Sequence, residues 1–183
     1  IVTARAGNVI GGGDWAKDRL IPDCVRSWSK NKKVELRNPK ATRPWQHVLE
    51  ALSGYLCLAI NLKHNKKLHG ESFNFGPDLR KEFSVLELVE EMSNHWENVS
   101  WKKISKSKKS FYESNLLRLN CNKAKKILKW KSILTFNENI KMVAIWYSTF
   151  YKNSKNIEFV TREQIKIYQT LAIKRGLNWV KMN

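Results

Sequence analysis

The amino-terminal segment joins an apolar stretch to a run of glycines, and this junction constrains the fold most strongly. Residues 1–6 look like a buried strand, and residues 7–15 form a loop that contains Gly11-Gly12-Gly13. A helix is expected next, with Pro22 in its first turn, where the missing N–H of proline costs no hydrogen bond. The chain opens inside the strand, at Ile1. We therefore expect a truncated sequence that lacks the strands flanking residues 1–6.

Short strands and helices alternate in the front third, and the back of the chain is mostly helical. Residues 34–37 and 72–75 are strand candidates, and apolar side chains recur at helical spacing from 47 to 62. A smaller helix is expected over 122–128. Three further helix starts have the capping-box spacing: Ser84 with Glu87, Thr135 with Glu138 and Thr161 with Gln164. This pattern predicts the edge of an α/β domain followed by a small helical lobe.

Composition favours a folded protein of the cytoplasm. The 183 residues are 42% hydrophobic and include eight Trp. No apolar run approaches the roughly 20 residues that cross a bilayer, and no secretory leader precedes the first strand. The three cysteines are far apart in the sequence and show no CxxC spacing, so we expect neither a disulfide framework nor a zinc site.

The net charge of +18 raises the possibility of nucleic-acid binding. Lys greatly outnumbers Arg, however, and the Lys residues are scattered along the chain rather than concentrated in one element. We therefore expect no nucleic-acid partner. A basic module that binds RNA or an acidic polymer remains the alternative from a different functional class.

The glycine run does not have the spacing of a dinucleotide-binding loop. That loop requires G-x-G-x-x-G at the start of a helix, whereas Asp14-Trp15 directly follows the three glycines. We expect a tightly turned loop without a phosphate cradle.

Two arginines are candidates for anion binding. Pro44 disfavours helical geometry at Arg43, so we expect the guanidinium to project from a loop, and Arg19 similarly stands before a helix. A planar guanidinium near a helix N-terminus suits a phosphate. His47, at a helix start, is expected to be a structural hydrogen-bonding residue rather than an acid–base catalyst.

Several blocks of the sequence together resemble one enzyme family. The blocks are Arg5–Trp15, Asp18–Asp23, Arg37–Pro39 and Arg43–Glu50, followed by Asn74–Pro77 and the segment 117–125. In this order and spacing they resemble the CDP-glucose 4,6-dehydratases, which are extended short-chain dehydrogenases/reductases. The combination of Gly-Gly-Gly-Asp-Trp with Arg-Pro-Trp-Gln-His is the most specific part of the match.

The resemblance implies an α/β fold: the carboxy-terminal part of an extended Rossmann fold plus a small, mostly helical substrate-binding lobe. Residues 1–76 would end the NAD-binding domain, interleaved with the lobe segment 14–43. Residues 77–151 would form the rest of the lobe, and 152–183 a helical tail. It also implies substrate-binding roles. Asn8 would contact a phosphate oxygen, Arg19 and Arg43 the diphosphate, and Arg37 the base, with Asn74 and Asn115 as further contacts.

The resemblance further implies the reaction and its partners. NAD would oxidise C4 of CDP-glucose, water would leave across C5 and C6, and hydride would return to C6. Tyr147 is followed four residues on by Tyr151 rather than by Lys. We expect the catalytic Tyr and Lys before Ile1, so this chain should be inactive alone, and the full-length enzyme should be a homodimer. A related nucleotide-sugar epimerase or reductase is the second interpretation.

Overall fold

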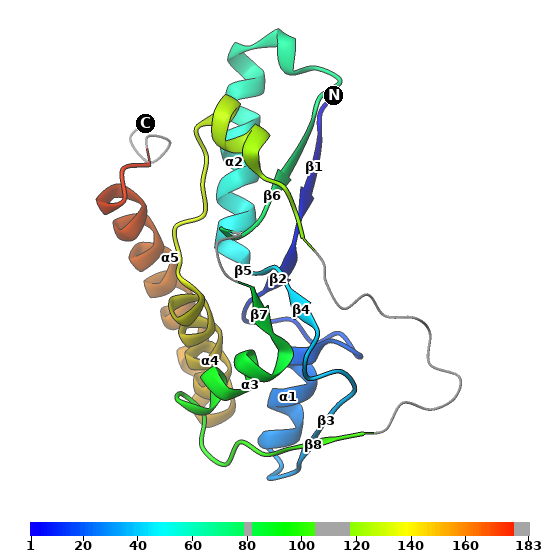
Figure 1. Ribbon diagram of the computed structural model, residues 1–183. Coiled ribbons are helices and arrows are strands. Elements are labelled where there is room, and N and C mark those ends of the chain that lie inside the picture. The colour runs from blue at the N-terminus through cyan, green and yellow to red at the C-terminus, as the bar shows by residue number, and fades with distance from the viewer. Residues whose placement is uncertain (79–81, 105–117, 178–183) are drawn as a thin grey trace.

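The computed structural model describes residues 1–78, 82–104 and 118–177, and its strands form short pairs rather than one sheet (Figure 1). Three pairs are parallel: β1 (Thr3–Ala6) with β6 (Ser72–Phe75), β2 (Asn8–Ile10) with β5 (Trp45–His47), and β3 (Val34–Leu36) with β8 (Trp101–Lys103). The fourth pair is antiparallel and joins β4 (Thr42–Arg43) to β7 (Phe83–Ser84). No described helix is long and apolar enough to cross a membrane.

The helix α2 (Val48–His64) packs against the β1–β6 pair at very short range. A Cβ atom at Gly54 would lie 2.3 Å from the ring of Phe75, so only glycine allows this approach. Phe73, Phe75 and Trp130 are buried in the core below the helix. This core also takes in the π-type turn η2 (Ala124–Leu128), where the sequence predicted a small helix.

The first strand, whose sequence is of the buried type and was expected to lack its neighbours, is exposed in the chain as described. Residues 3–5 of β1 are exposed and Ala6 is half-buried. The described residues supply β6 on one edge of β1 and no strand on the other. The apolar character of residues 1–6 is therefore not matched by burial within this chain.

Three helices share the core of the lobe: α1 (Leu20–Trp28), α3 (Val85–Ser93) and α4 (Phe136–Asn153). Pro22 lies in the first turn of α1, as predicted. The capping boxes Ser84–Glu87 and Thr135–Glu138 are both complete and begin α3 and α4 as predicted. Figure 1 shows this lobe below the β1–β6 pair, with β3 and β8 at its outer edge.

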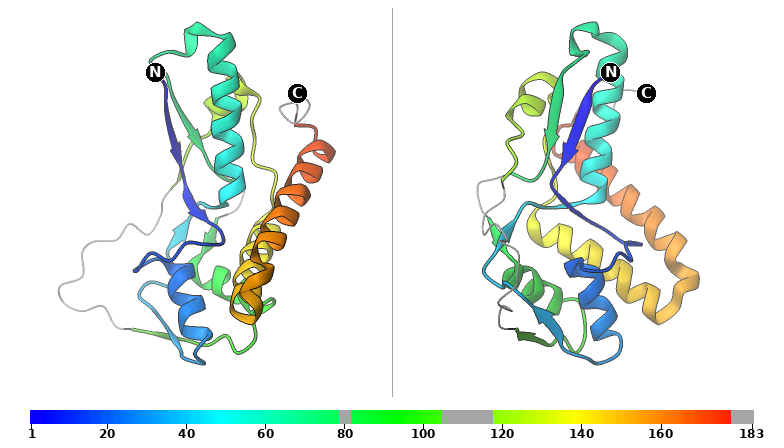
Figure 2. Two further views of the ribbon diagram at one scale, coloured as in Figure 1. Left: turned by 180° about the vertical axis from the view of Figure 1, so that it is seen from behind. Right: turned by 90° about the vertical axis from the view of Figure 1, so that its right-hand side faces the viewer.

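The last helix, α5 (Ile157–Lys174), follows the short turn η3 (Ser154–Asn156) and lies along α4 in both views of Figure 2. The predicted helix start at Thr161 is wrong, because Thr161 lies inside α5. Its hydroxyl donates to the carbonyl of Ile157 at 2.8 Å and accepts from Trp146 Nε1 at 3.0 Å. Gln164 Nε2 donates to the carbonyl of Met142 at 2.7 Å, so this polar pair attaches α5 to α4 instead of capping it.

A buried carboxylate connects α2, α5 and the segment before α4. Glu50 Oε1 accepts from the backbone N–H groups of Ile133 and Leu134 at 2.7 and 2.6 Å, and Oε2 accepts from the hydroxyl of Tyr168 at 2.9 Å. Burial raises the pKa of Glu50, and these three donors oppose the increase. The three attachments fix α2 relative to the lobe.

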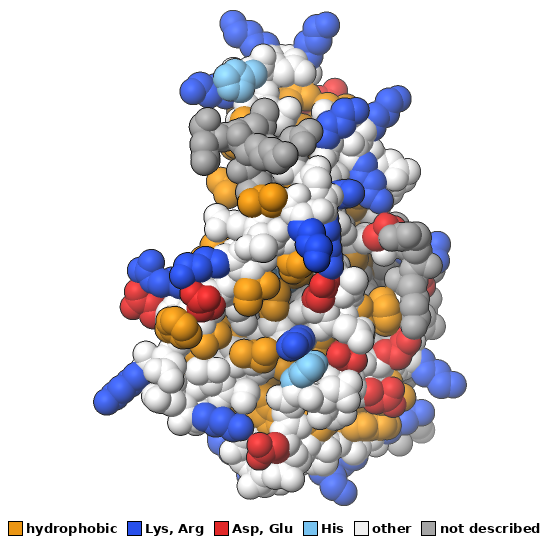
Figure 3. Space-filling view, turned by 90° about the vertical axis from the view of Figure 1, so that its left-hand side faces the viewer, with side chains coloured by type: hydrophobic (Ala, Val, Ile, Leu, Met, Phe, Trp, Pro, Cys, Tyr) orange, Lys and Arg blue, Asp and Glu red, His pale blue; other side chains and the backbone are white. Residues whose placement is uncertain are grey.

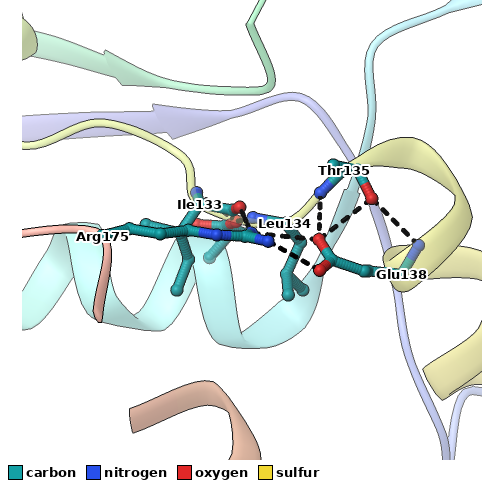
Figure 4. A network of polar contacts seen from close by, with 6 residues as sticks. Ile133, Leu134, Thr135, Glu138 and Arg175 are labelled. Carbon is teal, nitrogen blue, oxygen red and sulfur yellow. Dashed lines mark hydrogen bonds and ion pairs between the residues drawn. The ribbon is translucent and has the colours of Figure 1, made fainter. Parts of the chain in front are cut away.

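A second polar contact fixes the end of α5 (Figure 4). The guanidinium of Arg175 forks onto the Glu138 carboxylate at 2.7 and 3.0 Å and also donates to the carbonyl of Ile133. Glu138 simultaneously completes the capping box at Thr135. The hydrogen bond from Arg175 is the main reason that the pKa of Glu138 falls to about 2.

Candidate functional site

A cavity of about 800 Å³ lies between the β2–β5 pair and the lobe. Its wall includes residues of β2, the start of α1, β3 and the segment 43–45. Four residues that the resemblance assigned to substrate binding line it together: Asn8, Arg19, Arg37 and Arg43. The folded chain thus brings together residues that lie up to 35 positions apart in the sequence.

Local backbone structure places each of these side chains. Asn8 begins β2 opposite Trp45 of β5. Arg19 occupies the N-cap position of α1 in an extended conformation, and Arg37 directly follows β3. Arg43 lies in β4 opposite Phe83 rather than in a loop, so the expectation of a loop there is wrong. Its extended conformation agrees with the restriction that Pro44 imposes.

The cavity arginines have polar partners in this structure. Arg19 pairs with Asp14 at 3.3 Å, Arg37 pairs with Asp18 at 3.0 Å, and Arg43 Nη1 donates to the carbonyl of Thr42 at 2.7 Å. The Arg37–Asp18 pair and the Arg19 side chain are largely solvent-exposed, whereas Asp14 is half-buried, and exposed pairs contribute about 0–1 kcal/mol. An anion that offers several oxygens to a planar guanidinium can compete with an exposed carboxylate partner.

Other carboxylates of the lining are occupied by cations outside it. Asp23 pairs with Arg26 at 2.5 Å, and Glu35 pairs with Lys102 at 2.9 Å. These contacts reduce the negative charge that an entering anion would meet. The cavity is consequently better suited to an anionic ligand than the sum of its lining charges indicates.

The glycine-rich loop beside the cavity is fixed by α4. A Cβ atom at Gly12 would lie 2.0 Å from the ring of Trp146, and the hydroxyl of Tyr147 donates to the carbonyl of Asp14 at 2.7 Å. The Trp15 ring lies 4.9 Å from that of Phe150 and 5.4 Å from that of Tyr147 between centroids. The Gly-Gly-Gly-Asp-Trp sequence is thus explained by packing: it holds Asp14, the partner of Arg19, against the lobe.

The glycine run Gly11–Gly13 does not form a phosphate cradle for a dinucleotide. A phosphate cradle needs glycines that leave room for the phosphate, but the space beside Gly12 is filled by Trp146. This agrees with the tightly turned loop expected from the sequence.

Tyr151 and Lys155 do have the Tyr-x-x-x-Lys spacing, which a search starting from Tyr147 misses. Tyr151 lies at the end of α4, with its ring 5.8 Å from that of Trp96 and 5.5 Å from that of Phe150. Neither Tyr151 nor Lys155 lines the cavity. This match in spacing therefore places no tyrosine or lysine against a ligand there.

The remaining predicted site residues lie elsewhere. Asn74, in β6, does not line the cavity, and its Nδ2 donates to the carbonyl of Asn120 at 3.1 Å. Asn115 lies outside the described residues.

His47 is buried, and its Nδ1 accepts from the N–H of Leu49 at 3.2 Å. Burial lowers the pKa of His47 to about 4, so the ring is neutral at pH 7 and serves as a structural hydrogen-bonding residue.

A second pocket, of about 370 Å³, shares Arg43, Pro44 and Trp45 with the cavity, and no metal site stands out in the described part of the chain. It contains no group of three or more His, Cys, Asp or Glu side chains that could hold a metal ion. On the face shown in Figure 3, Lys and Arg side chains are dispersed among acidic and hydrophobic ones rather than gathered in one patch. The cavity is therefore the candidate functional site.

Comparisons with known proteins show what the whole chain is similar to. No family model matches the chain. In sequence it is 38% identical over 175 residues to the CDP-glucose 4,6-dehydratase of Salmonella typhimurium. The matched region covers 95% of this chain and 48% of that enzyme. In structure it resembles the dTDP-glucose 4,6-dehydratase of Bacillus anthracis, solved in complex with NAD. The TM-score is 0.64 at 21% identity, covering 87% of this chain and 47% of that one.

A UDP-glucuronic acid 4-epimerase from Bacillus cereus, solved with UDP-glucuronic acid and NAD, is similar as well. The TM-score is 0.67 at 15% identity, covering 82% of this chain and 46% of that one. The chain has the carboxy-terminal portion of the extended short-chain dehydrogenase/reductase fold. It spans about half the length of the relatives that it matches.

Within this extended short-chain dehydrogenase/reductase fold, the sequence interpretation missed three contributors to the cavity. Arg118 lines it and pairs with Glu82, although it lies 75 positions after Arg43 in the sequence. Tyr55 reaches it from α2. In the sequence Asp14 only interrupts the glycine run. Its position five residues before Arg19, across a loop, is the one signal of their ion pair.

Proposed function

We propose that this chain is the nucleotide-sugar-binding part of a CDP-glucose 4,6-dehydratase, which forms CDP-4-keto-6-deoxyglucose. The observation that carries the proposal is the convergence of Asn8, Arg19, Arg37 and Arg43 on one cavity. The sequence similarity to the Salmonella typhimurium dehydratase, at 38% identity over 95% of the chain, supports the choice of CDP-glucose.

The roles of the residues follow from their chemistry. Arg19 and Arg43 would bind the diphosphate, because a guanidinium can donate two parallel hydrogen bonds to one phosphate. The Asn8 side-chain amide would donate to a phosphate oxygen. Arg37, beyond β3 and further along the cavity wall, would meet the base. These contacts would choose and orient the substrate.

The whole reaction also needs groups that this chain does not place in the cavity. NAD, which related structures contain, would supply oxidation at C4 and reduction at C6 of the sugar. The described residues have no cradle for it, so the dinucleotide and the proton-transferring residues would belong to other parts of the enzyme. Alone, this chain would bind the substrate without turnover. The complete enzyme would be a cytoplasmic homodimer.

Nucleotide-dependent thermal stabilisation tests the proposal. A ligand that binds only the folded state raises the unfolding temperature, so CDP and CDP-glucose should stabilise the protein, whereas GDP and dTDP at the same concentration should not. Equal stabilisation by all three nucleotides would contradict the choice of cytidine. Stabilisation by RNA that disappears steeply with added salt would instead support a basic binding module.

A further inference from the structure

The second pocket, of about 370 Å³, is lined by β5, the β4–β7 pair, the start of α4 and the segment 132–135. We call it the β5 pocket. Figure 4 shows Ile133, Leu134 and Thr135, which belong to this lining. At about 30 Å³ for each water molecule, its volume corresponds to about a dozen waters. The β5 pocket is therefore large enough to hold a small ring compound.

Buried polar atoms without partners gather at this pocket. Six buried side-chain nitrogen or oxygen atoms have no hydrogen-bond partner in the described part of the chain, and four of them belong to residues that line the β5 pocket. These four are Trp45 Nε1, Gln46 Oε1, His47 Nε2 and Asn139 Oδ1. All four residues are at most 8% exposed. Because folded proteins rarely leave buried polar atoms unpaired, four at one pocket indicate a bound molecule that supplies their partners.

The four atoms divide into two donors and two acceptors. The Nδ1 atom of His47 accepts from the N–H of Leu49 at 3.2 Å, so a neutral ring carries its proton on Nε2 and donates from there. The indole N–H of Trp45 is the second donor. The Gln46 amide is oriented by its Nε2, which donates to a backbone carbonyl at 2.8 Å, so Oε1 is an acceptor, as is Asn139 Oδ1. A matching ligand therefore carries both acceptors and donors.

The charged side chains of the lining already have partners. Glu50 accepts from three donors, and Glu82 and Asp78 pair with an arginine and a lysine outside the lining. Arg43 Nη1 donates to a backbone carbonyl at 2.7 Å. An ion that entered would lose its hydration without gaining a new counter-ion, which is unfavourable. The pocket is therefore suited to an uncharged ligand.

Aromatic rings in the lining favour a flat ligand. Phe83 of β7 and Phe136 of α4 stack on each other with centroids 3.7 Å apart and planes 3° apart. A flat ring can pack against such side chains, while N–H and C=O groups on its edge meet the four polar atoms. We propose that the β5 pocket binds an uncharged nucleobase-like heterocycle. This site is separate from the substrate cavity and does not depend on the function proposed for that cavity.

Free bases are suitable probes for this site. Uracil, cytosine and adenine are uncharged at pH 7 and carry donors and acceptors on a flat ring. Saturation-transfer NMR should show that at least one of them binds the 183-residue chain with a Kd of about 1 mM or tighter. Glucose, which is uncharged but not flat, should not bind. Failure of all three bases to bind would overturn the proposal, and binding of glucose in their place would overturn the ligand class.

Two variants distinguish the β5 pocket from the cavity. Asn139→Leu removes one acceptor of the β5 pocket and should weaken binding of the base at least tenfold. Arg19→Ala changes a residue that lines the cavity and not the β5 pocket, so it should leave this binding unchanged. The reverse result would locate the base in the cavity and overturn the proposal.

The stability of Asn139→Leu is a second readout. Removing an acceptor that has no partner in the protein should leave the urea midpoint unchanged or raise it. Gln164→Leu is the matched control, because its buried amide donates to the carbonyl of Met142 at 2.7 Å. This control should lower the midpoint and keep binding of the base. A midpoint of Asn139→Leu that falls as far, or a variant that does not fold, would show that Asn139 is needed within the protein and would overturn the proposal.

Discussion

Gly12 lies so close to Trp146 that an added Cβ atom would stand 2.0 Å from the indole ring. The contact joins the loop after β2 to α4, 134 residues further along the chain (146 − 12 = 134). Because the same loop carries Asp14, the partner of Arg19, the packing of α4 helps to shape the cavity.

Gly12→Ala should destabilise the chain by about 1–3 kcal/mol, the usual cost of overpacking a filled site. The unfolding midpoint in urea measures this effect. Gly76→Ala is the matched control, since a Cβ atom there would meet its nearest neighbour at 3.4 Å, an ordinary contact. Equal midpoints for the two variants would mean that Trp146 moves away without cost.

Replacing Tyr168 by Phe should destabilise the chain by about 1–3 kcal/mol, because a buried carboxylate loses one of its donors. Tyr168 donates to Glu50 at 2.9 Å, and its hydroxyl also lies 2.8 Å from that of Ser53. The loss should raise the pKa of Glu50 further, since this hydrogen bond opposes the effect of burial. Tyr151→Phe, at a position 40% exposed, should leave the unfolding free energy nearly unchanged.

Acid should remove the contribution of the Arg175–Glu138 pair. The pKa of Glu138 falls from 4.5 to about 2 on folding, so the folded state binds fewer protons than the unfolded state between these values. Its stabilisation is therefore present above pH 4.5 and is lost as the pH falls towards 2. Wild type and Glu138→Gln should differ in urea midpoint at pH 7 and converge near pH 2.

A matched control for the acid experiment is Glu158→Gln. Glu158 pairs with Arg162 at 2.8 Å on the surface of α5, where both side chains are at least 70% exposed. Such a pair contributes little, so this variant should follow the wild type at every pH. A Glu138→Gln variant that did the same would show that the fork with Arg175 is not stabilising.

Local sequence signals predicted much of the fold correctly. The capping boxes at Ser84 and Thr135 are formed because each needs only a hydroxyl and a carboxylate one turn apart. The same spacing failed at Thr161, where tertiary contacts with Trp146 and Met142 use the two side chains instead. A local pattern cannot reveal that a helix begins earlier and packs on another.

The candidate site divides in a similar way. Asn8, Arg19, Arg37 and Arg43 were identified through a family resemblance carried by nearby blocks of sequence, and they do line one cavity. Tyr55 reaches it from a distant element that no short motif marks, and Arg118 lies in the segment 117–125, whose resemblance to the family assigned it no role. Residues 3–5 are exposed within this chain because burial of a strand depends on neighbouring strands, and the sequence analysis expected those strands to be missing.

Calorimetric titration of CDP-glucose into the wild-type protein and its Arg43→Ala variant tests the central claim most directly. The variant should bind more weakly by about 1–3 kcal/mol through the lost charge-assisted hydrogen bonds, with an unchanged unfolding midpoint. Arg162→Ala, which removes an exposed cation of α5, should bind as the wild type does. Equal affinity of wild type and Arg43→Ala for CDP-glucose would contradict the assignment of this cavity as the nucleotide-sugar site.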